Sequence, residues 1–234
     1  MADLARRRKR VSLEEQLDGG LEEGSGKFSI PSWLRRRAEY AVYAVCAVGI
    51  LILAALPVDV DSAPALEVDA FRVINGFPDF LDAPLWVAMQ LGNLIAAPAA
   101  AAVAGVFRRW RLMVGFLLLG AGKWILARVV KDLVIRHRPG TFLDDVIVRD
   151  EFGAGKAFVS GHAVIAVGIA TLAHPYLGKR GRIILWTLAG LVCFGRVYVG
   201  AHLPLDVIGG AALGVAIGAV IHAVLGVSRS QEVR

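Results

Sequence analysis

Six apolar stretches separated by short polar segments dominate this sequence of 234 residues. A helix of about 20 mostly apolar residues crosses the hydrocarbon core of a bilayer, and each stretch is close to that length. Helices are expected because a lipid-exposed segment must satisfy its backbone hydrogen bonds internally. The sequence therefore predicts an all-α, integral membrane bundle of six transmembrane helices, at residues 38–57, 85–107, 112–135, 158–177, 183–198 and 204–227.

The composition agrees with a membrane protein and gives no sign of a nucleic-acid partner. Hydrophobic residues make up 56% of the chain, more than a soluble domain typically carries. The formal net charge of +6 comes from short basic clusters beside the apolar stretches, so the expected partner is the lipid bilayer. Residues 1–37 are polar and of mixed charge, typical of a mostly disordered tail, and residues 228–234 form a second tail.

The positions of the basic clusters predict the orientation of the bundle. They precede the first stretch, separate the second from the third and the fourth from the fifth, and follow the sixth. Because such loops stay on the cytoplasmic side, both termini are expected in the cytoplasm of a bacterium. The loop at residues 58–84 is then outward, with an interfacial helix within residues 68–84 that turns Phe71, Ile74 and Phe77 toward the membrane.

This topology brings a group of polar residues to the outward ends of the third to sixth stretches. Ionisable groups in or near a membrane are costly, so a cluster of them indicates a functional site. Its members are Lys131, Arg136, His137, Arg138, Ser160, His162, Arg196, His202 and Asp206.

The segment HLPLD, residues 202–206, begins the sixth stretch. Pro204 suits the first position of a helix, which puts His202 just before the helix and Asp206 in its first turn. The helix N-terminus favours an ionised Asp206, which can accept the Nδ1 proton of His202 and leave Nε2 free to attack an electrophile. A capping aspartate beside an interfacial histidine would give the same pattern.

Two further segments favour an anion. In SGH, residues 160–162, a serine and a glycine open a helix whose unpaired N–H groups can bind an anion, and His162 can supply a proton, although many helices begin this way. Lys131 and Arg138 are seven positions apart, so they share a helix face and suit phosphate. They lie on the outward side, where the positive-inside rule disfavours basic residues.

Together these segments describe a phosphoryl-transfer site. Two histidines, an orienting carboxylate and three cations meet at a helix start, with no cysteine or multi-carboxylate set for a metal. Protein cations would then stabilise the charge that magnesium often stabilises. The segments KDLVIRHRP (131–139), SGH (160–162) and RVYVGAHLPLD (196–206) also resemble, in order and spacing, the three motifs of the type-2 phosphatidic acid phosphatase superfamily, KxxxxxxRP, PSGH and SRxxxxxHxxxD.

The resemblance implies a role for each matching residue. His202 would be the nucleophile that forms a phosphohistidine, Asp206 would orient it, and His162 would protonate the leaving group and then activate water. The phosphoryl oxygens would be held by Lys131, Arg138, Ser160, Gly161 and Arg196. The resemblance implies no metal or other cofactor.

Two positions depart from the family motifs. Val159 stands where the family usually has proline and Gly195 where it usually has serine, and neither position supplies a principal catalytic group.

Four further residues in or near the first motif are candidates for secondary substrate contacts. They are Lys123, Arg128, Arg136 and His137. For each of these, an interfacial or structural role is the alternative.

The predicted function is metal-independent hydrolysis of a membrane lipid phosphate or diphosphate at the outer membrane face. Phosphatidate, phosphatidylglycerol phosphate and polyprenyl (di)phosphate all fit, and the short outward loop before SGH suits lateral entry from the bilayer. A lipid phosphotransferase using the same phosphohistidine and a non-catalytic anion or lipid transporter are the alternatives.

Overall fold

The computed structural model describes residues 32–150 and 155–227, and every regular element within those ranges is helical. The predicted tails lie outside them, apart from residues 32–37, which belong to the first helix. The chain divides into two compact units, Met1–Arg35 and Arg36–Arg234, and all contacts described below lie within the second. The all-α prediction is confirmed.

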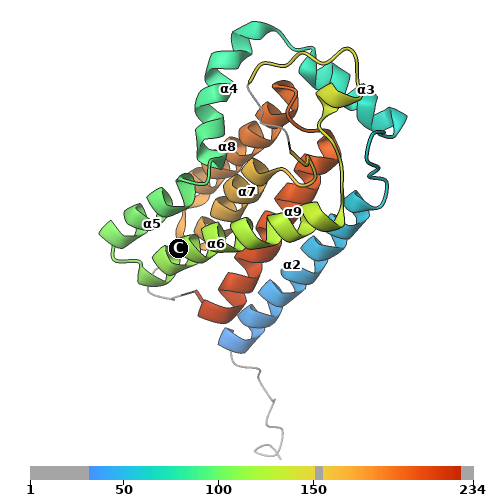
Figure 1. Cartoon of the computed structure of the whole chain (residues 1–234). Helices are drawn as coiled ribbons and strands as arrows, with labels where there is room; N and C mark the ends of the chain where they lie inside the picture. Colours follow the sequence, from blue (N-terminus) through green and yellow to red (C-terminus); the bar gives the residue numbers. More distant parts are fainter. Residues whose placement is uncertain (1–31, 151–154, 228–234) are drawn as a thin grey trace, which may run out of the picture. The chain divides into compact units, whose positions relative to one another are not determined.

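The helices follow one another along the chain without long connections, except before α7 (Figure 1). In order they are α2 (Ser32–Ala55), α3 (Ala65–Asn75), α4 (Asp82–Met89), α5 (Ala96–Val106), α6 (Trp110–Leu133), α7 (Gly161–Ala173), α8 (Lys179–Tyr198) and α9 (Pro204–Leu225). Short 3₁₀ turns lie at Asp79–Leu81, Gln90–Gly92, Pro139–Thr141 and His174–Tyr176.

Four of these helices, α2, α6, α8 and α9, are long and apolar enough to cross a membrane. A fifth span results if α4 and α5, with their 3₁₀ turns, are counted as one bent segment. The predicted count of six is therefore not reproduced by length and composition. The predicted spans and the helices of the structure differ at two stretches, residues 85–107 and residues 158–177.

The predicted transmembrane helix at residues 85–107 is broken into two helices in the structure. It breaks after Gly92, and its two halves are bent by 68°. Asn93 is extended at the break, with φ −66° and ψ 151°. Gly92 has no room for a side chain there, because a Cβ would lie 2.8 Å from the Cβ of His162. The break thus lets the chain approach the start of α7 closely.

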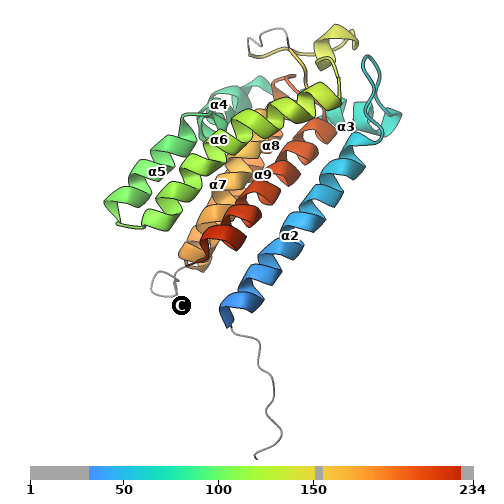
Figure 2. The same ribbon diagram turned by 60° about the horizontal axis from the view of Figure 1, so that its bottom comes forward.

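The stretch at residues 158–177 forms a helix shorter than expected. α7 has 13 residues and so extends about 20 Å, less than the roughly 30 Å of hydrocarbon. Eight of those residues are buried, since α7 packs against α6, α8 and α9 (Figure 2). A helix enclosed by protein on these sides does not have to match the bilayer by itself.

α3 is the helix that was predicted in the loop at residues 58–84, but its apolar face does not point to the membrane as expected. Phe71 is 1% exposed and packs with Leu203 and Val207, while Ile74 is half-buried against the bundle. Phe77 alone of the three is exposed, and its ring contacts that of Phe194. α3 turns inward because it packs against the end of α8 and the start of α9.

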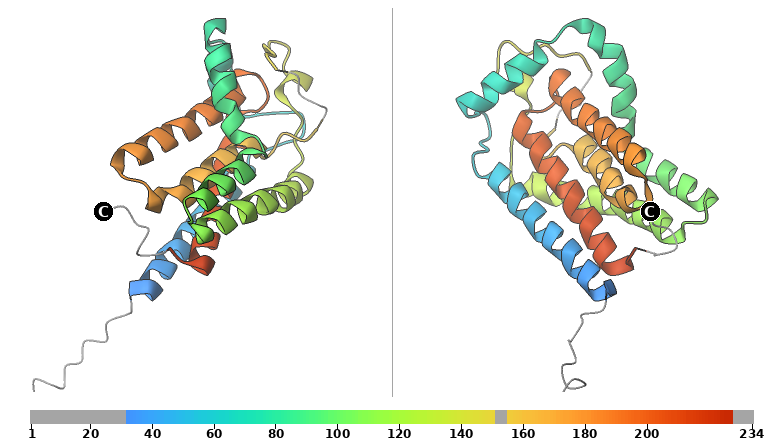
Figure 3. Two further views of the ribbon diagram at one scale, coloured as in Figure 1. Left: turned by 90° about the vertical axis from the view of Figure 1, so that its left-hand side faces the viewer. Right: turned by 180° about the vertical axis from the view of Figure 1, so that it is seen from behind.

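Three glycines of α9 fix its register against α7. Gly210, Gly214 and Gly218 are spaced four residues apart, which puts small residues on one helix face. A Cβ on Gly210 would lie 2.5 Å from the carbonyl oxygen of Ser160, and one on Gly214 would lie 2.6 Å from that of Val164. The backbones of the two helices therefore come into close approach, and the helices lie side by side in the rear view of Figure 3. Their N-terminal ends meet where the Ser160 N–H donates to the Asp206 carbonyl.

Candidate active site

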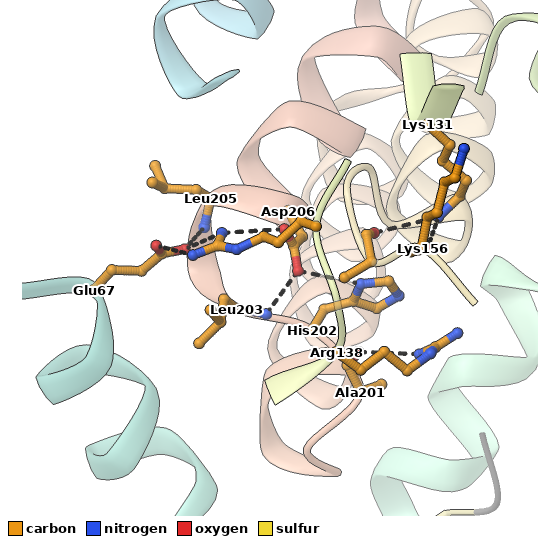
Figure 4. Close-up of polar contacts among 11 residues, drawn as sticks. Glu67, Lys131, Arg138, Lys156, Ala201, His202, Leu203, Leu205 and Asp206 are labelled. Carbon is orange, nitrogen blue, oxygen red and sulfur yellow. Dashed lines mark hydrogen bonds and ion pairs between the residues drawn. The ribbon is translucent and has the colours of Figure 1, made fainter. Parts of the chain in front are cut away.

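His202 and Asp206 lie together at the start of α9. His202 is 3% exposed and Asp206 is fully buried, and His202 Nδ1 lies 3.5 Å from Asp206 Oδ2 (Figure 4). The same carboxylate oxygen accepts the N–H of Leu203 at 2.9 Å. The 3.5 Å distance is longer than a typical hydrogen bond, and such catalytic contacts often tighten only when substrate binds.

The other oxygen of Asp206 faces a buried arginine. Arg136 Nη1 lies 3.3 Å from Asp206 Oδ1 and 3.0 Å from Glu67 Oε1, and Arg136 Nη2 lies 2.6 Å from Glu67 Oε2. Glu67 Oε1 also accepts the N–H of Leu205 at 2.9 Å. A continuous chain of polar contacts thus runs from His202 through Asp206 and Arg136 to Glu67 of α3.

Three basic side chains surround the predicted nucleophile. Arg138 Nη1 donates to the carbonyl of Ala201 at 3.0 Å, and Arg196 lies 3.5 Å from Asp150 Oδ2. Lys131 Nζ donates to the carbonyls of Lys156 and Ala157 at 2.5 and 3.3 Å. Their charge also acts on His202: burial first, and then Arg196, Arg138 and Lys131, hold the pKa of its imidazole well below the ordinary value.

Ser160 occupies the N-cap position of α7 without capping the helix. Its side chain makes no cap hydrogen bond, and its buried Oγ has no hydrogen-bond partner among the described residues. Its N–H donates to the carbonyl of Asp206 at 2.9 Å, which ties the start of α7 to α9. A buried hydroxyl without a partner at a helix N-terminus is suited to an anionic oxygen.

Within residues 32–150 and 155–227, no group of three or more histidine, cysteine, aspartate or glutamate side chains has the arrangement of a metal site. The charges that act on His202 belong to the cationic side chains of Arg196, Arg138 and Lys131, which are groups suited to phosphate oxygens.

The model of the PAP2 superfamily matches residues 109–229, which is more than half of the chain. This chain belongs to the PAP2 superfamily. The match extends from the start of α6 to the end of α9 and so contains all three motif segments. The family predicted from those motifs is confirmed.

Several curated PAP2 relatives are similar in sequence over part of their length. A lipid A 4'-phosphatase from Porphyromonas gingivalis is 29% identical over 106 residues, 43% of this chain and 45% of the relative. An undecaprenyl-diphosphatase from Sulfolobus acidocaldarius is 35% identical over 92 residues, 38% of this chain and 44% of the relative. The matched part thus spans less than half of either protein. A decaprenylphosphoryl-5-phosphoribose phosphatase from Mycobacterium tuberculosis is 29% identical over 144 residues, 60% and 72% of the two chains.

Two solved structures share the fold. Aquifex aeolicus LpxE superposes with a TM-score of 0.65 at 27% identity, covering 70% of this chain and 98% of its own. A transmembrane PAP2-type phosphatidylglycerolphosphate phosphatase from Bacillus subtilis superposes with a TM-score of 0.61 at 23% identity, covering 76% of this chain and 93% of its own. With the apolar helices described above, these likenesses identify the chain as an integral membrane protein.

Arg136 and His137, two of the four candidates for secondary substrate contacts, follow α6 and differ in their exposure. Arg136 is fully buried and bound to Glu67 and Asp206, so it is neither an interfacial residue nor a headgroup contact in this structure. His137 is half-exposed, and its Nδ1 lies 2.6 Å from Asp61 Oδ1. Neighbouring residues of one motif thus point in opposite directions, because the chain is no longer helical after Leu133.

The other two candidates lie beside the site, on α6. Lys123 reaches the start of α7, where a Cβ built on Gly161 would lie 3.3 Å from its Nζ. The guanidinium of Arg128 lies over the ring of Trp124, 4.9 Å from the centroid. Both line one cavity with Lys131.

Several residues that support the site have no signal in the sequence. Asn75 Nδ2 donates to the carbonyls of Ile147 and Tyr198, both at 2.8 Å, and Arg149 Nη1 donates to that of Tyr198 at 3.0 Å. These bonds fasten the turn before His202, in which Gly200 has φ +80°. The partners of Asn75 lie 72 and 123 positions away, so only the folded chain shows them.

The two departures from the PAP2 motifs occupy tightly packed positions. Val159 is fully buried in the main core cluster. A Cβ on Gly195 would lie 3.0 Å from Met89 Cγ, so a serine there would displace that side chain or shift α4. The glycine is therefore explained by the close approach of α4 to α8.

Proposed function

We propose that this protein is a membrane phosphatase that removes a phosphoryl group from a lipid phosphate or diphosphate. His202 Nε2 attacks phosphorus, the P–O bond to the lipid breaks, and water then hydrolyses the phosphohistidine. The single observation that carries the proposal is the contact between the buried His202 and Asp206, surrounded by Lys131, Arg138 and Arg196. An imidazole held neutral by burial retains the lone pair that a nucleophile needs.

The other residues of the site have matching roles. Lys131, Arg138 and Arg196, with the hydroxyl of Ser160 and the N–H groups at the start of α7, hold the phosphoryl oxygens as charge develops on them. His162, in the first turn of α7, protonates the leaving oxygen and later accepts a proton from the attacking water. The cations stabilise the transition state without a metal ion.

The orientation of the bundle is part of the proposal. The ends of α6 and α8 and the starts of α7 and α9 carry the site, while the basic residues that begin α6 and α8 lie at their opposite ends. By the positive-inside rule the basic ends are cytoplasmic, so the site faces outward and both termini are inside. Substrate then enters from the outer leaflet.

The relatives support a lipid substrate. Those reported above are named as phosphatases of lipid A, of undecaprenyl diphosphate and of a decaprenylphosphoryl sugar phosphate. We infer that this chain likewise acts on a membrane lipid, with its hydrocarbon chains in the bilayer beside the helices.

The test is phosphate release from a panel of lipid phosphates by the purified protein in detergent. We expect release that persists in EDTA and is lost in His202→Ala, while His174→Ala, at the other end of α7, behaves as wild type. Loss of activity in EDTA, or activity retained in His202→Ala, would contradict the mechanism. Transfer of the phosphoryl group to an added alcohol instead of water would identify a phosphotransferase. Binding of the lipid phosphate without turnover would identify a transporter.

A further inference from the structure

A cationic cavity adjoins the predicted phosphate site on the side of α6 and α7. Its volume is about 350 Å³. Four of its eight lining residues are basic and one is acidic, and they are Lys123, Trp124, Ala127, Arg128, Lys131, Asp132, Lys156 and Gly161. Lys131 and Gly161 belong to both the cavity and the predicted phosphate site. The two spaces are therefore contiguous.

Most of the charged groups in this cavity already have a contact. Lys156 Nζ lies 2.7 Å from Asp132 Oδ1, and Arg128 stacks on Trp124. Lys131 donates to two backbone carbonyls. The acidic residue is thus engaged by one of the four basic residues, which leaves the cavity with an excess of positive charge.

Lys123 is the exception. It is half-buried in the middle of α6, and it makes no hydrogen bond or ion pair with any residue in the described ranges. A charged side chain within a spanning helix is costly to insert, so such a lysine usually serves a partner or a ligand. Here its ammonium group packs over Gly161, next to the residue assigned as the general acid.

The position of the cavity relative to His162 indicates which part of the substrate it contacts. A general acid must lie beside the leaving group, and Gly161 directly precedes His162. The cavity that borders Gly161 therefore lies beside the first turn of α7, which also carries His162. Lys123 lies eight residues before Lys131, about 12 Å further along α6 and deeper in the membrane, which is the side from which a lipid chain would extend.

We propose that the cavity binds a second phosphoryl group, so that the site prefers lipid diphosphates over the corresponding monophosphates. The inference rests on the proposed function. His202 Nε2 forms a bond to the terminal phosphorus, the bond from that phosphorus to the bridging oxygen breaks, and the electron pair stays on the departing lipid monophosphate. That leaving group gains negative charge, which Lys123 stabilises.

The test compares one lipid chain carrying either one phosphate or two. Geranylgeranyl monophosphate and geranylgeranyl diphosphate are assayed separately for inorganic phosphate release in detergent. Wild type is expected to show the higher kcat/KM with the diphosphate. Lys123→Met should lower that value roughly 10- to 100-fold, as for one lost charge-assisted hydrogen bond, and leave the monophosphate value unchanged. The unchanged monophosphate activity also shows that the variant is folded.

Two further variants sharpen the result. Lys123→Arg keeps the charge and should keep the diphosphate preference. Lys179→Met, at the opposite end of the bundle, should leave kcat/KM unchanged for both substrates. Equal losses on both substrates in Lys123→Met, or no loss on either, would overturn the inference while leaving the phosphatase intact. Failure of wild type to hydrolyse either lipid would instead contradict the proposed function.

Discussion

Arg136 and Glu67 form a bidentate ion pair in which the arginine is fully buried, with N–O distances of 3.0 and 2.6 Å. The pair connects α3, in the loop that follows the first spanning helix, to the carboxylate of Asp206. Burial lowers the pKa of Arg136, but the bonds and charges of Glu67 and Asp206 outweigh it, and the pKa is raised. Arg136 is therefore charged, and we regard it as a positioning residue.

Removing this arginine should destabilise the protein. Arg136→Ala leaves the buried carboxylates of Glu67 and Asp206 without the arginine that pairs with both, so we expect a loss of roughly 3–5 kcal/mol in the free energy of unfolding, measured by denaturation in detergent micelles. The matched control is Arg72→Ala, since the ion pair of Arg72 with Asp145 is about half-exposed at 51% and 52%. That change should cost about 1 kcal/mol or less. Similar losses in both variants would show that the buried pair has no special role.

Glu67 should affect catalysis without touching substrate. Glu67→Gln keeps the shape of the side chain but weakens its hold on Arg136, so we expect kcat to fall roughly 10- to 100-fold with KM nearly unchanged. Combined with Asp206→Asn, its effect should be much less than additive, because both changes act through the same imidazole. Additive effects in this double-mutant cycle, or a change confined to KM, would argue against a positioning role.

The lowered pKa of His202 predicts how stability depends on pH. An unfolded histidine has a pKa of about 6.5, and the folded value lies below it, so below that pH the unfolded chain binds the additional proton. The contribution of His202 to stability is complete above about pH 6.5 and is lost as the pH falls, by up to roughly 1.4 kcal/mol per unit. Thermal unfolding at about pH 7 and pH 5 should show a smaller acid-induced loss in His202→Gln than in wild type; equal losses would exclude a depressed pKa.

The contact between α7 and α9 should not tolerate a methyl group. Gly214→Ala would put a Cβ 2.6 Å from the Val164 carbonyl oxygen, so we expect a loss of roughly 1–3 kcal/mol and reduced activity as the two motif segments separate. Gly190→Ala is the control, because nothing lies within 4 Å of a Cβ at that position. It should be neutral or slightly stabilising. A stable, fully active Gly214→Ala protein would show that this register is not needed.

The sequence predicted the all-helical membrane fold and the family, because hydrophobic length and the three motifs are local properties of the chain. It did not predict the break after Gly92 or the short α7, since both depend on what packs around them. Hydrophobicity alone cannot distinguish a helix facing lipid from one enclosed by other helices. For the same reason Phe71 was expected at the membrane and lies in the core.

The site was predictable only as far as its motifs extend. The contact between His202 and Asp206 follows from their separation of four residues in the sequence, whereas Glu67, the partner of Arg136, lies 69 positions away from it. Because Arg136 lies between Lys131 and Arg138 in the sequence, it could equally have pointed toward a substrate. Only the end of α6 at Leu133, which frees the following residues from helical spacing, decides that it points toward Glu67.

A covalent intermediate on His202 is the most direct test of the mechanism. The purified protein is mixed with lipid phosphate labelled in the reacting phosphoryl group, quenched within a single turnover under alkaline conditions, and digested for peptide mapping. We predict an acid-labile phosphohistidine on the peptide that contains His202, present in wild type and absent in His202→Ala. Steady turnover with no labelled protein at any quench time, or label that persists in His202→Ala, would contradict the proposal that His202 is the nucleophile.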